Sequence, residues 1–88
     1  MMLPKALPGL QVIGVRYRGS RPAQNDERAL NAYAASKVYE AGNVPYDVAA
    51  YAVGSVYGEG DGSEVSVASG IELIRGGLKA WHRYGMPE

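Results

Sequence analysis

The chain has 88 residues, which is room for one domain and too few for two. It contains no cysteine, so disulfides, cysteine-ligated metals and thiol nucleophiles are excluded, and the chain fits a reducing compartment such as the cytoplasm. Nine basic and nine acidic residues give a formal net charge of zero, and a charged fraction of 20% is too low for a disordered tail.

The charges are nevertheless sorted along the chain. Residues 1–22 carry four basic side chains and no acid, residues 38–72 carry six acids and no base, and residues 73–88 are basic again. Two basic segments around an acidic one can complement each other, a second copy of the chain, or a partner of either sign. The charge pattern therefore predicts an interaction without naming the partner.

The N-terminal part predicts an extended arm followed by a strand. Prolines interrupt residues 1–9 before an apolar run develops, so we expect an arm there rather than a signal peptide. Residues 10–18 are rich in β-branched and aromatic side chains without a helical period, which predicts a strand. Residues 10–88 are then expected to form one small globular domain, and no apolar run is long enough to span a bilayer.

Residues 22–41 predict a long helix, opened by a proline and closed by a Gly-Asn pair. One stripe, formed by Leu30, Ala34 and Val38, is expected to face the core. The opposite side is also made of small or apolar residues, which indicates a helix with contacts on both faces. We therefore expect self-association or partner binding through this second face, formed by Arg28, Ala32, Ala35, Ser36 and Tyr39.

Residues 44–69 decide the fold class, and they allow two interpretations. The segment from Val44 to Asp47 is typical of a helix start, because proline suits the first turn and an acid the helix dipole. The apolar run up to residue 57, a glycine-rich loop and the alternating residues 64–68 instead predict a β-hairpin. We expect the hairpin, and hence an α+β fold of N-terminal strand, long helix, hairpin and C-terminal amphipathic helix. An all-α three-helix domain with an extended N-terminal arm is the alternative.

Residues 70–84 predict an amphipathic helix that begins at a capping box, residues 69–72, and ends at a glycine. Its apolar half is expected to place three side chains in the core: Ile74, Leu78 and Trp81. Gly76 and Gly77 each cost about 1 kcal/mol relative to Ala inside a helix. We therefore expect a neighbouring element to pack closely against the backbone at these two positions.

Few residues suit catalysis or metal binding. His82 is the only histidine, and it falls on the charged side of the last predicted helix, where a solvated position is expected. The acidic loop around Gly62 does not match a calcium-binding EF-hand, because Tyr57 and Ala68 stand where the motif needs Asp and Glu. We expect no catalytic residues, no metal site and no cofactor.

The arginines allow a nucleic-acid or nucleotide-binding protein as an alternative. Two of them are two residues apart, so a strand would point both to one face, as β-ribbon proteins do to reach bases or phosphates. The strand would contribute Arg16, Arg18 and Arg21, and the last helix would add Arg75, Lys79 and Arg83. Nucleic-acid binders usually have a clearly basic domain, whereas this chain is neutral, so we favour pairing of these residues with acidic segments.

The aromatic residues favour an interaction surface. Seven tyrosines and one tryptophan stand beside no phenylalanine, so every aromatic ring carries a polar atom, and both residue types are enriched at protein interfaces. Together with the sorted charges and the two-faced helix, this predicts a small non-enzymatic interaction module. We expect it to form a homo-oligomer and to act as a regulator or inhibitor by binding a larger protein, with no membrane partner.

Overall fold

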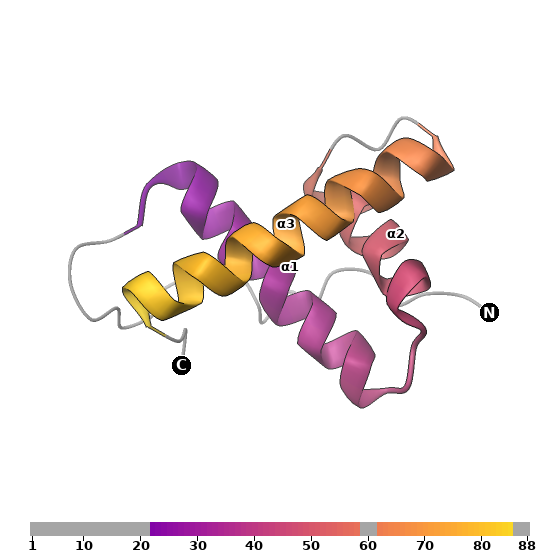
Figure 1. The fold of residues 1–88 in the computed structure, drawn as a ribbon, viewed down its shortest axis with the longest axis horizontal. Coiled ribbons are helices and arrows are strands. Elements are labelled where there is room, and N and C mark those ends of the chain that lie inside the picture. The colour runs from indigo at the N-terminus through magenta and orange to yellow at the C-terminus, as the bar shows by residue number, and fades with distance from the viewer. Residues whose placement is uncertain (1–21, 59–61, 86–88) are drawn as a thin grey trace.

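The computed structural model describes residues 22–58 and 62–85, and this part of the chain folds as three α-helices. The helices are α1 (Gln24–Ala41), α2 (Tyr46–Tyr57) and α3 (Ser63–Tyr84). α3 crosses α1 near the middle of both helices, and α2 lies beside the first half of α3 (Figure 1). The long α3 is therefore the element on which the other two pack. In the part of the chain described, none of the helices combines the length and the apolar character needed to cross a bilayer.

The prediction of an α+β fold with a hairpin in residues 44–69 was wrong. Residues 46–57 and 63–69 are helical, so the described residues have the all-α architecture that was the alternative. The alternating residues 64–68 predicted a strand, but this segment is helical, and the positions that face inward are Ser66 and Gly70, which are four residues apart. Neither residue has a large apolar side chain, so a search for periodic apolar residues does not identify them as inner positions. The arm expected at residues 1–9 and the strand expected at residues 10–18 lie outside the described residues.

α2 and α3 pack backbone against backbone. A Cβ atom placed on Gly54 would collide with the carbonyl oxygen of Ser66, and one placed on Gly70 would collide with that of Ala50. In each helix the two small residues are four apart, so each helix offers the other a shallow ridge. The absence of two Cβ atoms is what allows the helices to approach this closely.

α3 crosses α1 at Gly77, where a Cβ atom would collide with the carbonyl oxygen of Ala29 and the Cβ of Tyr33. The close neighbour expected at this glycine is confirmed. It is not confirmed at Gly76, whose added Cβ would make one ordinary contact of 3.8 Å with the Cβ of Ala29. The core enclosed by the three helices is correspondingly rich in small residues, with a few larger ones among them: Ala32, Ala35, Tyr39, Ala49, Ala50, Ala52, Val53 and Ile74.

The helix ends agree in part with the sequence. Asn43, at φ 60°, makes the left-handed exit expected after α1, and Gly85, at φ 90°, ends α3. The capping box predicted at residues 69–72 was wrong, because these residues lie inside α3, whose N-cap is Gly62. α1 begins after Ala23 without a side-chain cap, and its first turn carries two acids that favour the helix dipole.

Candidate binding groove

The face of α1 proposed for self-association is largely buried in the core. Ala32, Ala35 and Tyr39 are 0%, 2% and 3% exposed, respectively, and they belong to the cluster between the three helices. On the stripe expected to face that core, Leu30 is buried but Val38 is 39% exposed. The burial of Leu30 is therefore as predicted. The exposure of Val38 and the burial of the second face were predicted wrongly, because the close crossing with α3 requires small side chains on the inner side of α1. The three buried residues are unavailable to a partner while the domain is folded.

Another surface of α1 does reach solvent, and it lines a groove. The groove has a volume of about 360 Å³ and lies where the second half of α1, the start of α2 and the middle of α3 meet. Its apolar surface comes from Val44, Ala49 and Ile74, and its two walls carry Tyr46 and Leu78. Four residues of α1 form its polar edge: Tyr33, Ser36, Lys37 and Glu40. We refer to this site as the Leu78 groove.

The walls of the Leu78 groove present large apolar side chains to solvent. Leu78 is 42% exposed and Tyr46 is 58% exposed. The prediction that Leu78 lies in the core was wrong, whereas Ile74, at 8% exposure, is buried as predicted. The inner side of α3 is centred on small residues such as Gly70 and Gly77, which turns Leu78 to the edge of the packed face.

Trp81 closes one end of the contact between α1 and α3. Its ring meets the ring of Tyr33 edge-on, with centroids 5.1 Å apart and an interplanar angle of 70°. Trp81 is half-buried rather than enclosed, so the prediction that it belongs to the core holds only in part. Edge-to-face pairs of this kind contribute about 0.5–1.5 kcal/mol beyond the area they bury, and here the pair fixes the Tyr33 ring at the groove.

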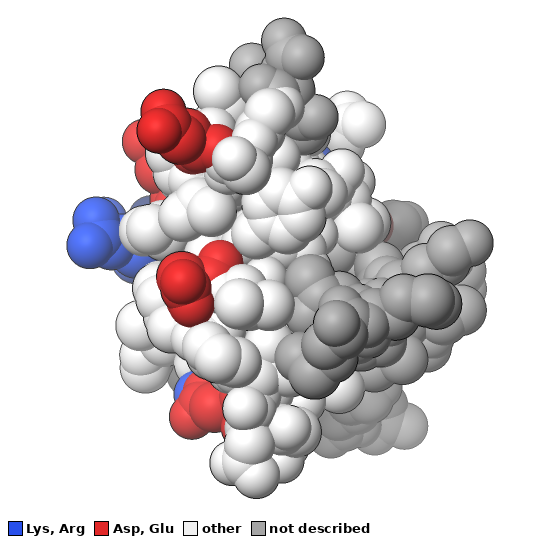
Figure 2. Space-filling model, turned by 90° about the vertical axis from the view of Figure 1, so that its right-hand side faces the viewer, with Lys and Arg blue, Asp and Glu red and all other residues white. Residues whose placement is uncertain are grey.

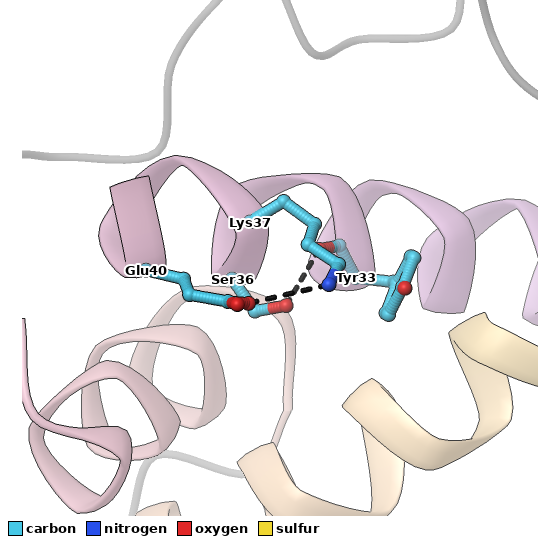
Figure 3. A network of polar contacts seen from close by, with 4 residues as sticks. All are labelled: Tyr33, Ser36, Lys37 and Glu40. Atoms are coloured by element: carbon cyan, nitrogen blue, oxygen red, sulfur yellow. Dashed lines mark hydrogen bonds and ion pairs between the residues drawn. The ribbon is translucent and has the colours of Figure 1, made fainter. Parts of the chain in front are cut away.

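The polar edge of the groove is satisfied within α1 itself. The four side chains lie along one side of the helix (Figure 3). The Ser36 hydroxyl donates a hydrogen bond of 2.6 Å to the carbonyl oxygen of Tyr33, and Lys37 Nζ lies 3.2 Å from Glu40 Oε2. Lys37 Nζ also stands 5.4 Å from the centroid of the Tyr33 ring, and its hydrogen bond to Glu40 raises the pKa of Lys37. An exposed pair of this kind contributes little to stability.

Exposed charged residues stand next to both wall residues of the Leu78 groove in the sequence. On the α3 side, Arg75 lies one turn before Leu78 and Lys79 directly follows it, and both basic side chains are exposed. Within residues 22–58 and 62–85, neither of them forms an ion pair. On the opposite side, the exposed Asp47 follows Tyr46 at the start of α2. None of these three residues lines the groove, and the two charged residues that do line it, Lys37 and Glu40, pair with each other.

A second hollow, of about 520 Å³, lies between the first half of α1, the end of α2 and the first half of α3. Arg28, Ser69 and Glu72 are among the residues that line it, so its surface is more polar than that of the Leu78 groove. Arg28 was predicted to bind a partner, and the structure leaves it exposed at this second hollow, separate from the Leu78 groove.

The side on which α2 lies presents a largely uncharged surface. Figure 2 shows acidic and basic side chains gathered along one edge of this view and uncharged residues over most of the described surface beside them. α2 itself carries a single charged residue, Asp47. Its exposed apolar side chains include Tyr51 at 41% and Val56 at 52%. Val56 offers a useful comparison with Leu78, because both are exposed apolar residues but Val56 lies outside the groove.

The remaining predicted site residues are dispersed. Arg75, Lys79 and Arg83 recur every four residues on the exposed side of α3, whereas Arg16, Arg18 and Arg21 lie outside the described residues. His82 is exposed, as expected. In the described part of the chain, no group of three or more His, Asp or Glu side chains could hold a metal ion.

Sequence reasoning identified one residue of the Leu78 groove for binding, Ser36, and placed Leu78 in the core instead. It did not assign Val44, Tyr46 and Ala49 to a site, because they precede the hairpin that was expected from residue 51 and the helix start at Val44 to Asp47 was only the alternative. The spacing of Tyr33, Ser36, Lys37 and Glu40 along one side of a helix was the available signal. Comparisons with models of known families, with curated proteins and with solved structures found no match for the chain.

Proposed function

We propose that this domain is a small, non-enzymatic protein-interaction module that holds an apolar segment of a larger protein in the Leu78 groove. The observation that carries the proposal is the pair of exposed apolar walls, Leu78 and Tyr46, on either side of a concave apolar surface. Covering apolar surface contributes roughly 25 cal/mol for each Å² removed from water. A concave site with few polar groups is the usual form of a surface that receives a side chain from a partner.

The residues in and around the groove indicate the chemistry of the partner segment. An amphipathic helix that places apolar residues in a groove presents them three or four positions apart. Acidic residues beside those apolar residues could pair with Arg75, which stands three residues before Leu78, is exposed and forms no ion pair within the described residues. Charge complementarity of this kind raises the association rate and fixes orientation. By covering a surface of its partner, the module would act as a regulator or inhibitor, in the cytoplasm to which a cysteine-free chain is suited.

The proposal can be tested with displayed peptides. A library of random peptides long enough to form a few helical turns is selected on the immobilised full chain, and recovered peptides are synthesised. We expect enrichment of sequences with apolar residues at helical spacing and acidic flanks. In the NMR spectrum of the labelled chain, the amide signals of Ser36, Ala49 and Leu78 should shift on binding.

Two variants make the test specific. Leu78→Glu should abolish peptide binding, whereas Val56→Glu, which adds the same charge at an exposed apolar position outside the groove, should leave it unchanged. Circular dichroism of both variants serves as the control that they fold. Selected peptides that bind both variants with the affinity of the unmodified chain, or a selection that enriches no sequence on any of the three proteins, would contradict the proposal.

A second candidate rests on the three exposed basic residues of α3, which recur every four positions and form no ion pair within the described residues. They belong to the surface predicted for nucleic acid. If that alternative holds, the chain is retained on DNA or RNA at low salt. Replacement of Arg75, Lys79 and Arg83 by Ala then makes the slope of log affinity against log salt shallower, by the amount expected for the loss of about three phosphate contacts.

A further inference from the structure

We infer that the second hollow, between α1, α2 and α3, binds a small zwitterion, a molecule that carries one carboxylate, one ammonium group and an aliphatic part. A free aliphatic amino acid and a short aliphatic peptide both have this chemistry. The hollow shares no lining residue with the Leu78 groove. The inference therefore goes beyond the proposed function, and either of the two can fail without the other.

All three helices contribute to the walls of this hollow. Its volume of about 520 Å³ lies within the range of roughly 300–1,000 Å³ that small-molecule sites occupy. The α3 wall is formed by residues at helical spacing, which therefore lie along one side of that helix: Val65, Ser69, Glu72 and Leu73. α2 contributes its C-cap, Gly58, where an added Cβ atom would collide with the Ser69 hydroxyl oxygen. The end of α2 therefore lies close against α3 beside the hollow.

Two of the lining residues are charged, and they have opposite signs. Arg28 stands on α1 and Glu72 on α3, and both are exposed. Within residues 22–58 and 62–85, neither forms an ion pair or a side-chain hydrogen bond, so the two charges line one hollow without pairing with each other. A ligand with a single charge leaves one of them without a partner. A zwitterion pairs with both at once, and a guanidinium group can hold its carboxylate through two parallel hydrogen bonds.

The apolar lining of the hollow suits an aliphatic group. Ala29, Val65 and Leu73 line it together with the two charged residues. Val65 is 45% exposed, so a ligand can cover apolar surface there that the folded chain leaves in water. Exposed ion pairs are individually weak, so we expect a dissociation constant on the order of 1 mM and recognition that depends on both charges together.

NMR titration of the labelled full chain tests the inference. L-leucine and the dipeptide leucyl-leucine are added separately, because the two charges are closer together in the amino acid than in the peptide. Saturable shifts of the amide signals of Ala29, Ser69 and Leu73 with either compound support the site, and the tighter compound shows the charge spacing that it prefers. No saturable shift of these signals with either zwitterion would overturn the inference.

Analogues that lack one charge test the need for both. They are 3-methylbutylamine and 4-methylpentanoate for leucine, and the forms with one end capped for the dipeptide. Each should bind about fivefold more weakly than the zwitterion from which it derives, because one ion pair is lost. A singly charged analogue that binds as tightly as the zwitterion would show that the hollow recognises one charge only, and would overturn the inference.

Variants assign each charge to its wall. Arg28→Gln should bind the zwitterion no tighter than the analogue without a carboxylate, and Glu72→Gln no tighter than the analogue without an ammonium group. Glu64→Gln is the matched control, since it makes the same change at another exposed acid of α3 that does not line the hollow, and it should keep the full affinity. Circular dichroism serves as the control that the variants fold. Unchanged affinity in both Arg28→Gln and Glu72→Gln, or an equal loss in Glu64→Gln, would overturn the assignment.

Discussion

Gly70 of α3 lies directly on the backbone of Ala50 in α2, so that a single added methyl group would collide with the Ala50 carbonyl oxygen. The three atoms that this methyl group would meet first are the carbonyl oxygen, the carbonyl carbon and the Cα of Ala50, all of them backbone atoms. The close contact is possible only because residue 70 has no Cβ atom. Alanine at this position should therefore destabilise the domain, although alanine is normally preferred over glycine in helices.

Gly70→Ala should destabilise the domain. Although alanine is the better helix former by about 1 kcal/mol, the new methyl group must push α2 away from α3, and overpacking of this kind costs about 1–3 kcal/mol or more. Gly76→Ala is the matched control in the same helix, since its Cβ would meet its nearest neighbour at 3.8 Å. We expect Gly76→Ala to stabilise by about 0.5–1 kcal/mol. Urea denaturation of the two variants checks this, and equal effects of the same sign would show that α2 and α3 are not in close contact.

The register of α3 can be tested with Ile74 and Leu78, two apolar residues one turn apart. Ile74 is 8% exposed and belongs to the core, so Ile74→Ala should cost about 2–4 kcal/mol of unfolding free energy. Leu78→Ala should cost about 1 kcal/mol or less, because the side chain is 42% exposed. Both are measured at one low protein concentration so that self-association does not contribute. Equally large costs would instead place both side chains in the core, as the apolar pattern predicts.

A hydrogen bond joins the two most distant parts of the described chain. The hydroxyl group of Tyr84, at the end of α3, donates to Asp26 Oδ2 in the first turn of α1 over 2.8 Å. A double-mutant cycle of Tyr84→Phe and Asp26→Asn should give a coupling energy of about 1 kcal/mol, since the contact is partly buried. The cycle separates this pair from the other contacts of Tyr84. Additive effects of the two changes would mean that the bond contributes nothing to stability.

Alkaline pH should destabilise the domain through two tyrosines. Burial raises the pKa of Tyr39 above its usual value, and burial together with the nearby Tyr39 raises the pKa of Tyr57. Above about pH 10, unfolded tyrosines lose their protons while these two retain theirs, so the folded state binds more protons than the unfolded state. Unfolding free energy should therefore be unaffected by these groups below that pH and fall as pH rises through their raised pKa values.

Urea midpoints measured from neutral pH to above pH 10 give the dependence. Replacing both residues, Tyr39→Phe with Tyr57→Phe, removes the two titrating groups and should flatten the alkaline decline, whatever the variant's stability at neutral pH. A decline of the same steepness in the double variant would assign it to other groups.

The helices that were recognised from sequence are those whose apolar residues follow a helical period or whose ends carry clear stop signals. The boundaries of α1 and the end of α3 belong to this class. The start of α3 and most of α2 were predicted as a hairpin instead. The reason is that the inner positions Ser66, Gly70 and Gly54 carry little apolar surface. A pattern of apolar residues cannot reveal a face whose defining property is small size.

The groove was less accessible to sequence reasoning than the helices. Its walls come from residues 46 and 78, and they meet only because two glycine crossings set the angles among three helices. The same crossings rotate α3 and turn Leu78 outward. Ser36 was assigned to a binding surface because it lies on the small-residue side of α1, and it does reach the groove, at the edge of that side.

The small-residue core changes where the entropy of folding is lost. Burying a long side chain freezes its rotamers at a cost of up to about 2 kcal/mol, whereas alanine and glycine have no rotamers to lose. In this domain the contacts at Ala50, Gly54, Gly70 and Gly77 are therefore made without side-chain ordering, and the loss falls on the backbone, where each glycine is the most mobile residue in the unfolded chain. Local helix formation and helix docking should consequently be closely coupled, since α2 and the first half of α3 gain their ordered backbones only when they touch.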